Sequence, residues 1–289
     1  MRRDDGLSRV LAVAALTLRE ASRRKIVLVA VLMSAAFLAL YGLGLHYAAV
    51  QLLTGGRMGI DELLRRGAAA QMLYIGLFPA SFIIALAAVF ASVSTISGEV
   101  ESGVAYAVLA RPIRRSEVVL GKFLGLGALL VSYALVLDGA VIALAAWQIH
   151  APVRLWPGAL ALMTLEPLVL LGLALLGSTR LPTLANGVLC TAAYGIGVVG
   201  GFIEQIGGLI RNDTMVQLGI VTSLLTPLDA VHRKALSLLL PGGLLFGQGT
   251  AGVGLGESAT PSTWMMLYAV GYVAVAVLLA TRVLRRRDL

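Results

Sequence analysis

Residues 96–122, ISGEVESGVAYAVLARPIRRSEVVLGK, decide how the chain is organised, because they separate two long apolar runs. Two acids, Glu99 and Glu101, open the stretch, and Arg111 and Pro112 end a short apolar run within it. Proline disfavours helical geometry in the residue before it, so a new helix is expected to begin only after this point. Each charge would cost about 2.5–3.5 kcal/mol at the centre of a bilayer. The stretch is therefore expected to lie in water or against another protein.

The composition outside this stretch is that of an integral membrane protein. The 289 residues are 58% hydrophobic and 13% charged, with a mean hydropathy of +0.90, whereas soluble domains are about 45–50% apolar and about 25% charged. Of the 23 Lys and Arg residues, seven precede residue 26, four lie within 97–122 and four follow residue 281. These basic segments are every second connection between the spans, which is the pattern that the positive-inside rule gives for the cytoplasmic side. The net charge of +8 therefore indicates membrane orientation, and we expect no nucleic-acid partner.

The apolar runs predict an all-α fold with six transmembrane helices. A run of about twenty residues forms a helix of about 30 Å, which crosses a bilayer once. The charged ends place both termini in the cytoplasm of a multi-pass protein of the cell (inner or plasma) membrane. The single cysteine, Cys190, excludes an intrachain disulfide, and the three histidines show no metal-ligand spacing. The expected spans are residues 26–45, 72–96, 118–147, 158–177, 183–202 and 264–280.

The sequence predicts a single domain over residues 1–289. Within it, three segments lie outside the spans, and a different structure is predicted for each. Residues 1–25 predict an amphipathic helix on the inner membrane surface, with packing on protein alone as the alternative. Residues 46–70 are expected to form an external loop with a short surface helix. Residues 204–262 are interrupted by prolines and glycines, and their charges favour the outer interface. We expect this last region to be extracytoplasmic and re-entrant or helical, and the alternative is an extra pair of spans within 216–245.

Two features inside the spans are candidates for function. Asp138 and Glu166 are acids within the third and fourth spans, and intramembrane acids usually face a bundle interior or an aqueous cavity. A substrate path is one interpretation, and a hydrogen-bonded structural acid near the outer interface is the one we favour. In the fifth span, Gly197 and Gly201 have the spacing of helix dimers. Such spacing is common in glycine-rich helices and is weak evidence for a dimer face.

The motif in residues 97–122 resembles the first cytoplasmic loop of ABC-2-type transporter permeases. The family pattern S-G-E-x-E-S-G, followed by R-P-x-x-R-x-E-x-x-x-G-K, is matched throughout. The resemblance implies a coupling helix region, residues 97–117, which docks on a separate ABC ATPase subunit. It also implies an assembly of two permeases, most simply a homodimer, with two ATPase copies. The residues that would couple to the ATPase are Gly98, Glu99, Glu101, Ser102, Gly103, Arg111, Pro112, Arg114, Arg115 and Glu117.

No catalytic residues are predicted in this chain. There is no G-x-x-x-x-G-K followed by Ser or Thr, no H-E-x-x-H and no G-x-S-x-G, so the chain cannot cleave ATP alone. No metal or cofactor is expected here, and ATP and Mg²⁺ would belong to the partner ATPase. The resemblance implies an exporter that moves its substrate out of the cytoplasm, and the largely apolar interface favours a lipophilic or amphipathic substrate. The alternative is a mechanotransmission protein, which acts on an extracytoplasmic partner without transport, and a membrane enzyme is disfavoured.

Overall fold

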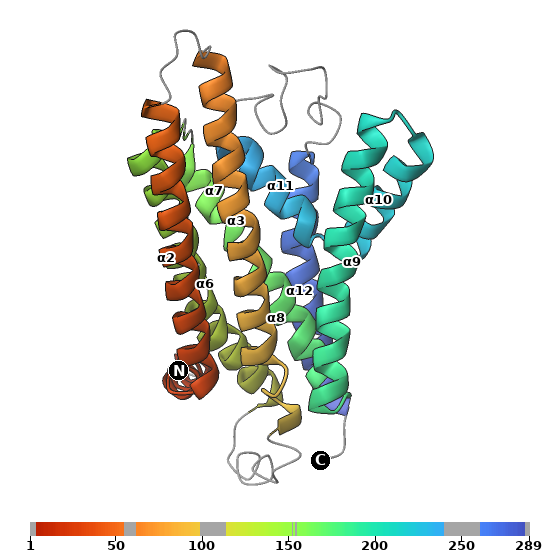
Figure 1. The fold of residues 1–289 in the computed structure, drawn as a ribbon. Helices are drawn as coiled ribbons and strands as arrows, with labels where there is room; N and C mark the ends of the chain where they lie inside the picture. The colour runs from red at the N-terminus through yellow and green to blue at the C-terminus, as the bar shows by residue number, and fades with distance from the viewer. Residues whose placement is uncertain are drawn as a thin grey trace.

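The computed structural model describes residues 4–54, 62–98, 114–151, 153, 155–239 and 261–286, and these contain helices and no strand. Long helices stand side by side in one bundle (Figure 1). The helices are α1 (Asp4–Ser22), α2 (Lys25–Thr54), α3 (Glu62–Ser92), α6 (Arg115–Ile149), α7 (Trp156–Met163), α8 (Leu165–Ser178), α9 (Thr183–Leu209), α10 (Asp213–Leu225), α11 (Leu228–Leu239) and α12 (Thr263–Arg286).

The prediction of an all-helical protein with six spans is confirmed for the described residues. Six helices or helix pairs are long and apolar enough to cross a membrane. The fourth of them is made by α7 and α8 together, with a break at Thr164 just before Glu166 and Pro167. The six candidate spans are Lys25–Val50, Gly67–Ser92, Arg115–Ile149, Trp156–Ser178, Thr183–Gly208 and Thr263–Arg285.

The expected external loop at residues 46–70 is largely helical, so this prediction is wrong for the described part. The helix α2 continues to Thr54, and α3 begins at Glu62. Residues 46–54 contain neither glycine nor proline, so nothing in their sequence stops the helix. The charged residues Arg65 and Arg66 begin the long α3 and do not form a separate surface helix.

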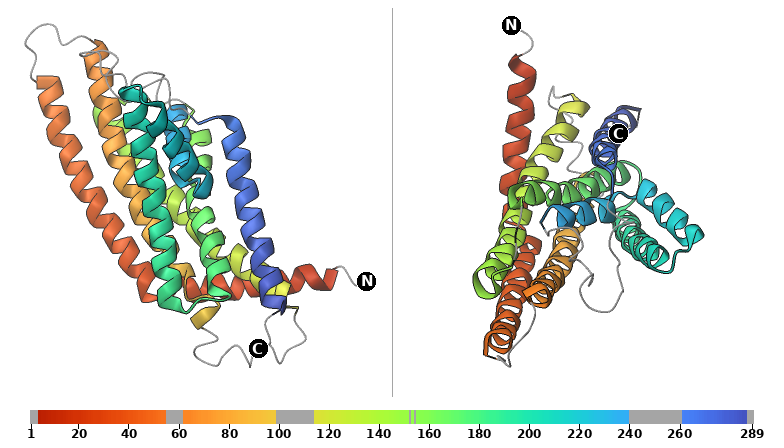
Figure 2. Two further views of the ribbon diagram at one scale, coloured as in Figure 1. Left: turned by 90° about the vertical axis from the view of Figure 1, so that its right-hand side faces the viewer. Right: turned by 90° about the horizontal axis from the view of Figure 1, so that it is seen from above.

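One end of the bundle, which we call the basic end, holds α1, the α8–α9 turn with Arg180 and the last turns of α12 with Arg282 and Arg285. The opposite half is called the distal half. The helix α1 lies across the basic end, roughly at right angles to the long helices (Figure 2). It packs along the first turns of α6, while Leu7 and Leu11 remain exposed. One side of the predicted amphipathic helix therefore packs on protein, and its exposed apolar residues lie apart from that side.

The core of the bundle has two parts. In one, Leu73 and Leu77 of α3 pack with Leu137 of α6 and Leu236 of α11. In the other, α6, α8 and α12 meet around Leu170, and residues of α9 join them. These clusters are continuous along α3 and α6, so movement of either helix affects both parts.

The helices α10 and α11 form a bent pair between the fifth and sixth spans. They meet at an angle of 104°, and the bend falls at Pro227, where a missing N–H and a fixed φ end the first helix. With 13 and 12 residues, each helix is about 20 Å long or less, too short to cross a bilayer alone. Together they are long and apolar enough for one broken span or a re-entrant loop, while the alternative of two extra spans within 216–245 extends into residues outside the described part. Residues 240–260 lie outside the described part.

Candidate functional site

Buried charged side chains gather around α11. This helix lies in the distal half of the bundle (Figure 1). Arg233 is buried, and its Nε donates a hydrogen bond of 2.7 Å to Oδ2 of Asp229, one turn earlier on the same helix. Its Nη2 donates at 2.6 Å to Oε2 of Glu204 on α9. One guanidinium thus holds carboxylates from two helices, which uses the fork geometry that distinguishes arginine from lysine.

The second pair in this region joins α11 to α8. Nδ1 of His232 lies 3.0 Å from Oε1 of Glu166, and both side chains are buried. The imidazole also lies edge-on to the ring of Phe78 on α3. Its other nitrogen, Nε2, has no hydrogen-bond partner among the described residues. A buried polar atom without a partner is costly.

Asp138 of α6 completes the group. Its side chain is only 3% exposed, and it lies within electrostatic range of Glu166 and His232. The structure therefore brings the two acids selected from the sequence into one site. We call the whole set the distal charge cluster, which consists of Asp138, Glu166, Glu204, Asp229, His232 and Arg233. Four acids surround one guanidinium and one imidazole, so acid is in surplus.

The glycines of α9 make this arrangement possible. A Cβ on Gly201 would stand 1.8 Å from Oδ2 of Asp229, and one on Gly197 would stand 2.9 Å from Oγ1 of Thr226. Only glycine admits this approach. Gly197 and Gly201 therefore face α11 and its N-terminal connection, and the idea that their spacing serves a dimer face is not supported. The spacing allows close packing within one chain.

Sequence reasoning missed four members of the cluster. The sequence predicts Glu204, Asp229 and Arg233 at the outer interface and gives His232 no role. In the structure, Asp229, His232 and Arg233 are buried, and Glu204 is almost buried. The physical reason is that α11 turns into the bundle, where it packs against α7, α8, α9 and α12. The sequence does contain a signal for this cluster: Asp229, His232 and Arg233 are spaced i, i+3 and i+4, and these positions share one face of a helix.

The coupling segment is described only at its two flanks. Gly98 closes the turn after α3, and its N–H donates to the carbonyl of Ser94. On the other flank, the backbone N–H of Arg114 donates at 3.0 Å to Glu117, which caps the start of α6. The helix α6 therefore begins just after Arg111 and Pro112, where the sequence predicts a new helix. The remaining predicted coupling residues lie outside the described residues; these are Glu99, Glu101, Ser102, Gly103, Arg111 and Pro112.

The second flank is attached to α12. Nη1 of Arg115 donates at 2.9 Å to the carbonyl oxygen of Leu284. In return, Nη2 of Arg285 donates at 3.3 Å to Oγ of Ser116. These reciprocal hydrogen bonds join the start of α6 to the last turns of the final span.

The first flank is attached to α8 and α9. Oγ of Ser97 lies 2.8 Å from Oγ1 of Thr183. The fully buried Asn186 of α9 donates at 3.1 Å to the carbonyl of Val93 and at 2.9 Å to that of Ala174 on α8. One amide thus joins the end of α3 to α8 and α9. The two flanks of one segment are therefore fastened to different helices.

Six candidate spans, a helix across one end and a buried charged site in the opposite half define a multi-pass helical membrane protein. A family model described as ABC-2 family transporter protein matches residues 11–289. The chain belongs to that family, and as a member it is the membrane domain of an ABC transporter. A search of curated proteins gave no match.

Proposed function

We propose that this chain is the permease subunit of an ATP-driven exporter and works with a separate ABC ATPase. Two permeases, in a homodimer, would bind two ATPase copies. The family supports this assembly, and so does the absence of a phosphate-binding loop in the sequence. ATP and Mg²⁺ would be held by the partner.

The observation that carries the proposal is the attachment of the two flanks. The first flank is bound to α8 and α9 through Asn186, and the second is bound to α12 through Arg115. A push on residues 99–113 by a closing ATPase would therefore act on both groups of helices at once. Packed helices transmit such displacements because protein interiors are close-packed. The segment would work as a lever between the ATPase and the bundle.

The distal charge cluster is the proposed outer gate. The helices that receive the first flank also carry two of the four acids of the cluster, because Glu166 is on α8 and Glu204 is on α9. The bent pair α10–α11 would enter the membrane from the extracytoplasmic side as a re-entrant element. A shift of α8 and α9 relative to α11 would separate the ion pairs. Separation in a dry site leaves buried charges unpaired at a cost of about 3–5 kcal/mol, so the gate opens only when water enters with the cargo.

The cargo is proposed to be lipophilic or amphipathic. Asp138 and Glu166 would lie on its path. The three paired acids Glu166, Glu204 and Asp229 outnumber their two basic partners, which favours cargo that carries a positive charge. Glu166→Gln should therefore reduce ATP-driven uptake of the lipophilic cation rhodamine 6G into proteoliposomes, with little change in bound ATPase. Equal uptake by the variant and the wild type would remove Glu166 from the path.

The assembly can be tested by purification of the tagged protein from its host in mild detergent. We expect an ABC ATPase subunit to be retained, identified by mass spectrometry and by ATP hydrolysis. The double variant Glu99→Gln, Glu101→Gln should lose most of this subunit, because the two acids are the proposed docking charges. The control is Asp213→Asn, an acid-to-amide change at the start of α10 in the distal half.

Two results would contradict the proposal. If the wild type retains no ATPase, the chain is not an ABC permease in the proposed sense. If the double variant retains as much ATPase as the control, the acids do not form the docking site. ATP hydrolysis that responds only to an added extracytoplasmic protein, with no dye uptake, would instead favour mechanotransmission.

A further inference from the structure

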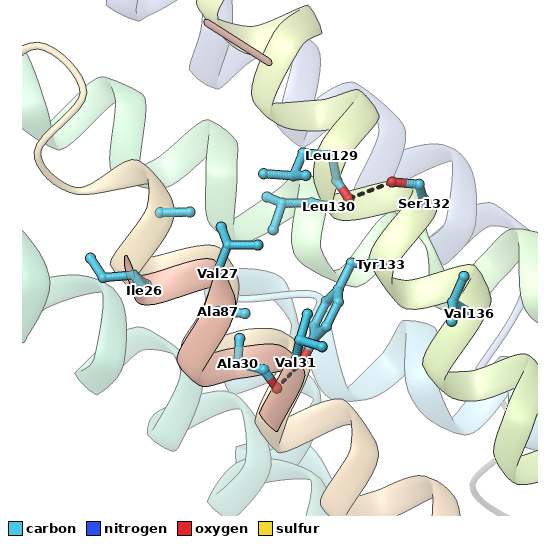
Figure 3. A pocket seen from close by; sticks show the side chains of 11 residues that line it. Ile26, Val27, Ala30, Val31, Ala87, Leu129, Leu130, Ser132, Tyr133 and Val136 are labelled. Atoms are coloured by element: carbon cyan, nitrogen blue, oxygen red, sulfur yellow. Dashed lines mark hydrogen bonds between the residues drawn. The ribbon is translucent and has the colours of Figure 1, made fainter. Parts of the chain in front are cut away.

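A cavity of about 280 Å³ lies between α2, α3 and α6 (Figure 3). It begins at the first turns of α2, where Ile26 and Val27 form part of its wall, so it belongs to the basic end. The other lining residues are Ala30 and Val31 of α2, Ala87 and Ala91 of the last half of α3, and Leu129, Leu130, Ser132, Tyr133 and Val136 of the middle of α6.

The wall of the cavity is almost entirely apolar. Its only hydroxyl groups belong to Ser132 and Tyr133. The Ser132 hydroxyl donates to the carbonyl of Leu129 at 2.8 Å, and the Tyr133 hydroxyl donates to that of Ala30 at 3.2 Å (Figure 3). A buried water needs two to four polar partners, whereas these groups are already bonded within the wall. The cavity therefore suits hydrocarbon better than water.

The mouth of the cavity opens on the outer surface of the bundle. Val136 is 71% exposed, Val31 51% and Ile26 40%. The helix α2 is the least buried of the candidate spans, with 11% of its most apolar window inside the bundle. In a membrane this surface meets lipid tails, which can enter from the side without crossing a polar region.

Two exposed basic residues precede Ile26 in the chain at the basic end. Arg23 and Lys25 are exposed, and Lys25 begins α2 immediately before Ile26. Arg24 between them is occupied by an ion pair with Glu20 at 2.6 Å. Exposed Lys and Arg at a membrane surface attract anionic lipid headgroups. The apolar cavity would thus suit an acyl chain, and the exposed basic residues would suit the anionic headgroup of the same lipid.

We propose that this cavity is a binding site for one anionic phospholipid of the leaflet at the basic end. One acyl chain fills the space between α2, α3 and α6, and the phosphate headgroup rests on Arg23 and Lys25. The inference needs only the membrane position of α2, so it does not depend on the exporter assignment. A lipid here would brace the three helices that border the coupling segment and α1.

The test is photo-crosslinking in nanodiscs with phosphatidylglycerol that carries a diazirine on one acyl chain. Mass spectrometry of the wild type should find the label on peptides of α2 and α6 that line the cavity. Ala87→Phe fills the cavity and should remove most of this label. The matched control is Ala185→Phe, which places the same ring on an exposed position in the first turn of α9 at the basic end.

The headgroup contact is tested separately by the double variant Arg23→Gln, Lys25→Gln, whose changes are exposed and leave the cavity intact. We expect labelling by phosphatidylglycerol to fall by about fivefold for each charge removed, and labelling by the matching phosphatidylcholine probe to stay constant. Equal labelling by both lipids in the wild type, or equal labelling of Ala87→Phe and Ala185→Phe, would overturn the proposal. So would displacement of the label by rhodamine 6G, which would make the cavity a cargo site.

Discussion

Arg233 is the residue on which the distal charge cluster depends. Its guanidinium contacts Asp229 and Glu204, and all three side chains are at most 12% exposed. Removal of one partner from a buried ion pair leaves uncompensated charge at a cost of about 3–5 kcal/mol. Lysine cannot fully replace Arg233, because a single ammonium group cannot donate to two carboxylates in the fork geometry of a guanidinium.

We predict that Arg233→Ala lowers the apparent Tm of the detergent-purified protein markedly, since two buried carboxylates lose their common partner. Scanning fluorimetry gives the measurement. The neighbouring Lys234→Ala removes a charge from the same helix at a half-buried position outside the pairs, and it should change the Tm little. Similar losses in the two variants would mean that the pairs seen around Arg233 do not stabilise α11.

At the scale of elements, the contact between α1 and α6 depends on small residues. A Cβ on Gly125 would stand 2.5 Å from the carbonyl oxygen of Ala14 and 2.9 Å from Cβ of Thr17, and one on Gly121 would meet Val13 at 2.6 Å. Backbone cannot yield as a flexible side chain does, so any larger residue must push α1 away from α6. The helix across the basic end is thus held by close backbone approach.

Gly125→Ala is predicted to destabilise the protein by about 1–3 kcal/mol, the usual cost of overpacking, and to make the junction of α1 and α2 more sensitive to limited proteolysis. Gly139→Ala is the matched control on α6, where an added Cβ meets nothing within 4 Å. Alanine there should be neutral or slightly stabilising because it favours the helix. Equal proteolysis rates in both variants would show that α1 is not held at Gly125.

For the whole molecule, the proposed orientation puts the basic end in the cytoplasm. Ser22 at the end of α1 and Thr214 on α10 are exposed and lie in opposite halves, while Cys190 is fully buried. We expect Thr214→Cys to react with a membrane-impermeant maleimide in intact cells and Ser22→Cys to react only after permeabilisation. The wild type supplies the background, since its single thiol is covered. The reverse pattern would invert the topology and remove the proposed docking side for an ATPase.

The six spans and the basic end could be predicted from the sequence because both depend on local properties. A run of twenty apolar residues has to form a helix in lipid, whatever its neighbours are. The flanking Lys and Arg residues then indicate which ends share a side. The start of α6 at Arg115 follows in the same way from proline and from local charge.

The distal charge cluster and the lipid-facing cavity were decided only by tertiary structure. Residues 166, 204 and 229–233 are far apart in the chain, and each is an isolated charge until α11 bends at Pro227 and turns into the bundle. Hydropathy alone assigns such charges to water, because it cannot represent a partner supplied by another helix. Burial of a charge depends on that partner, and the partner is a property of packing.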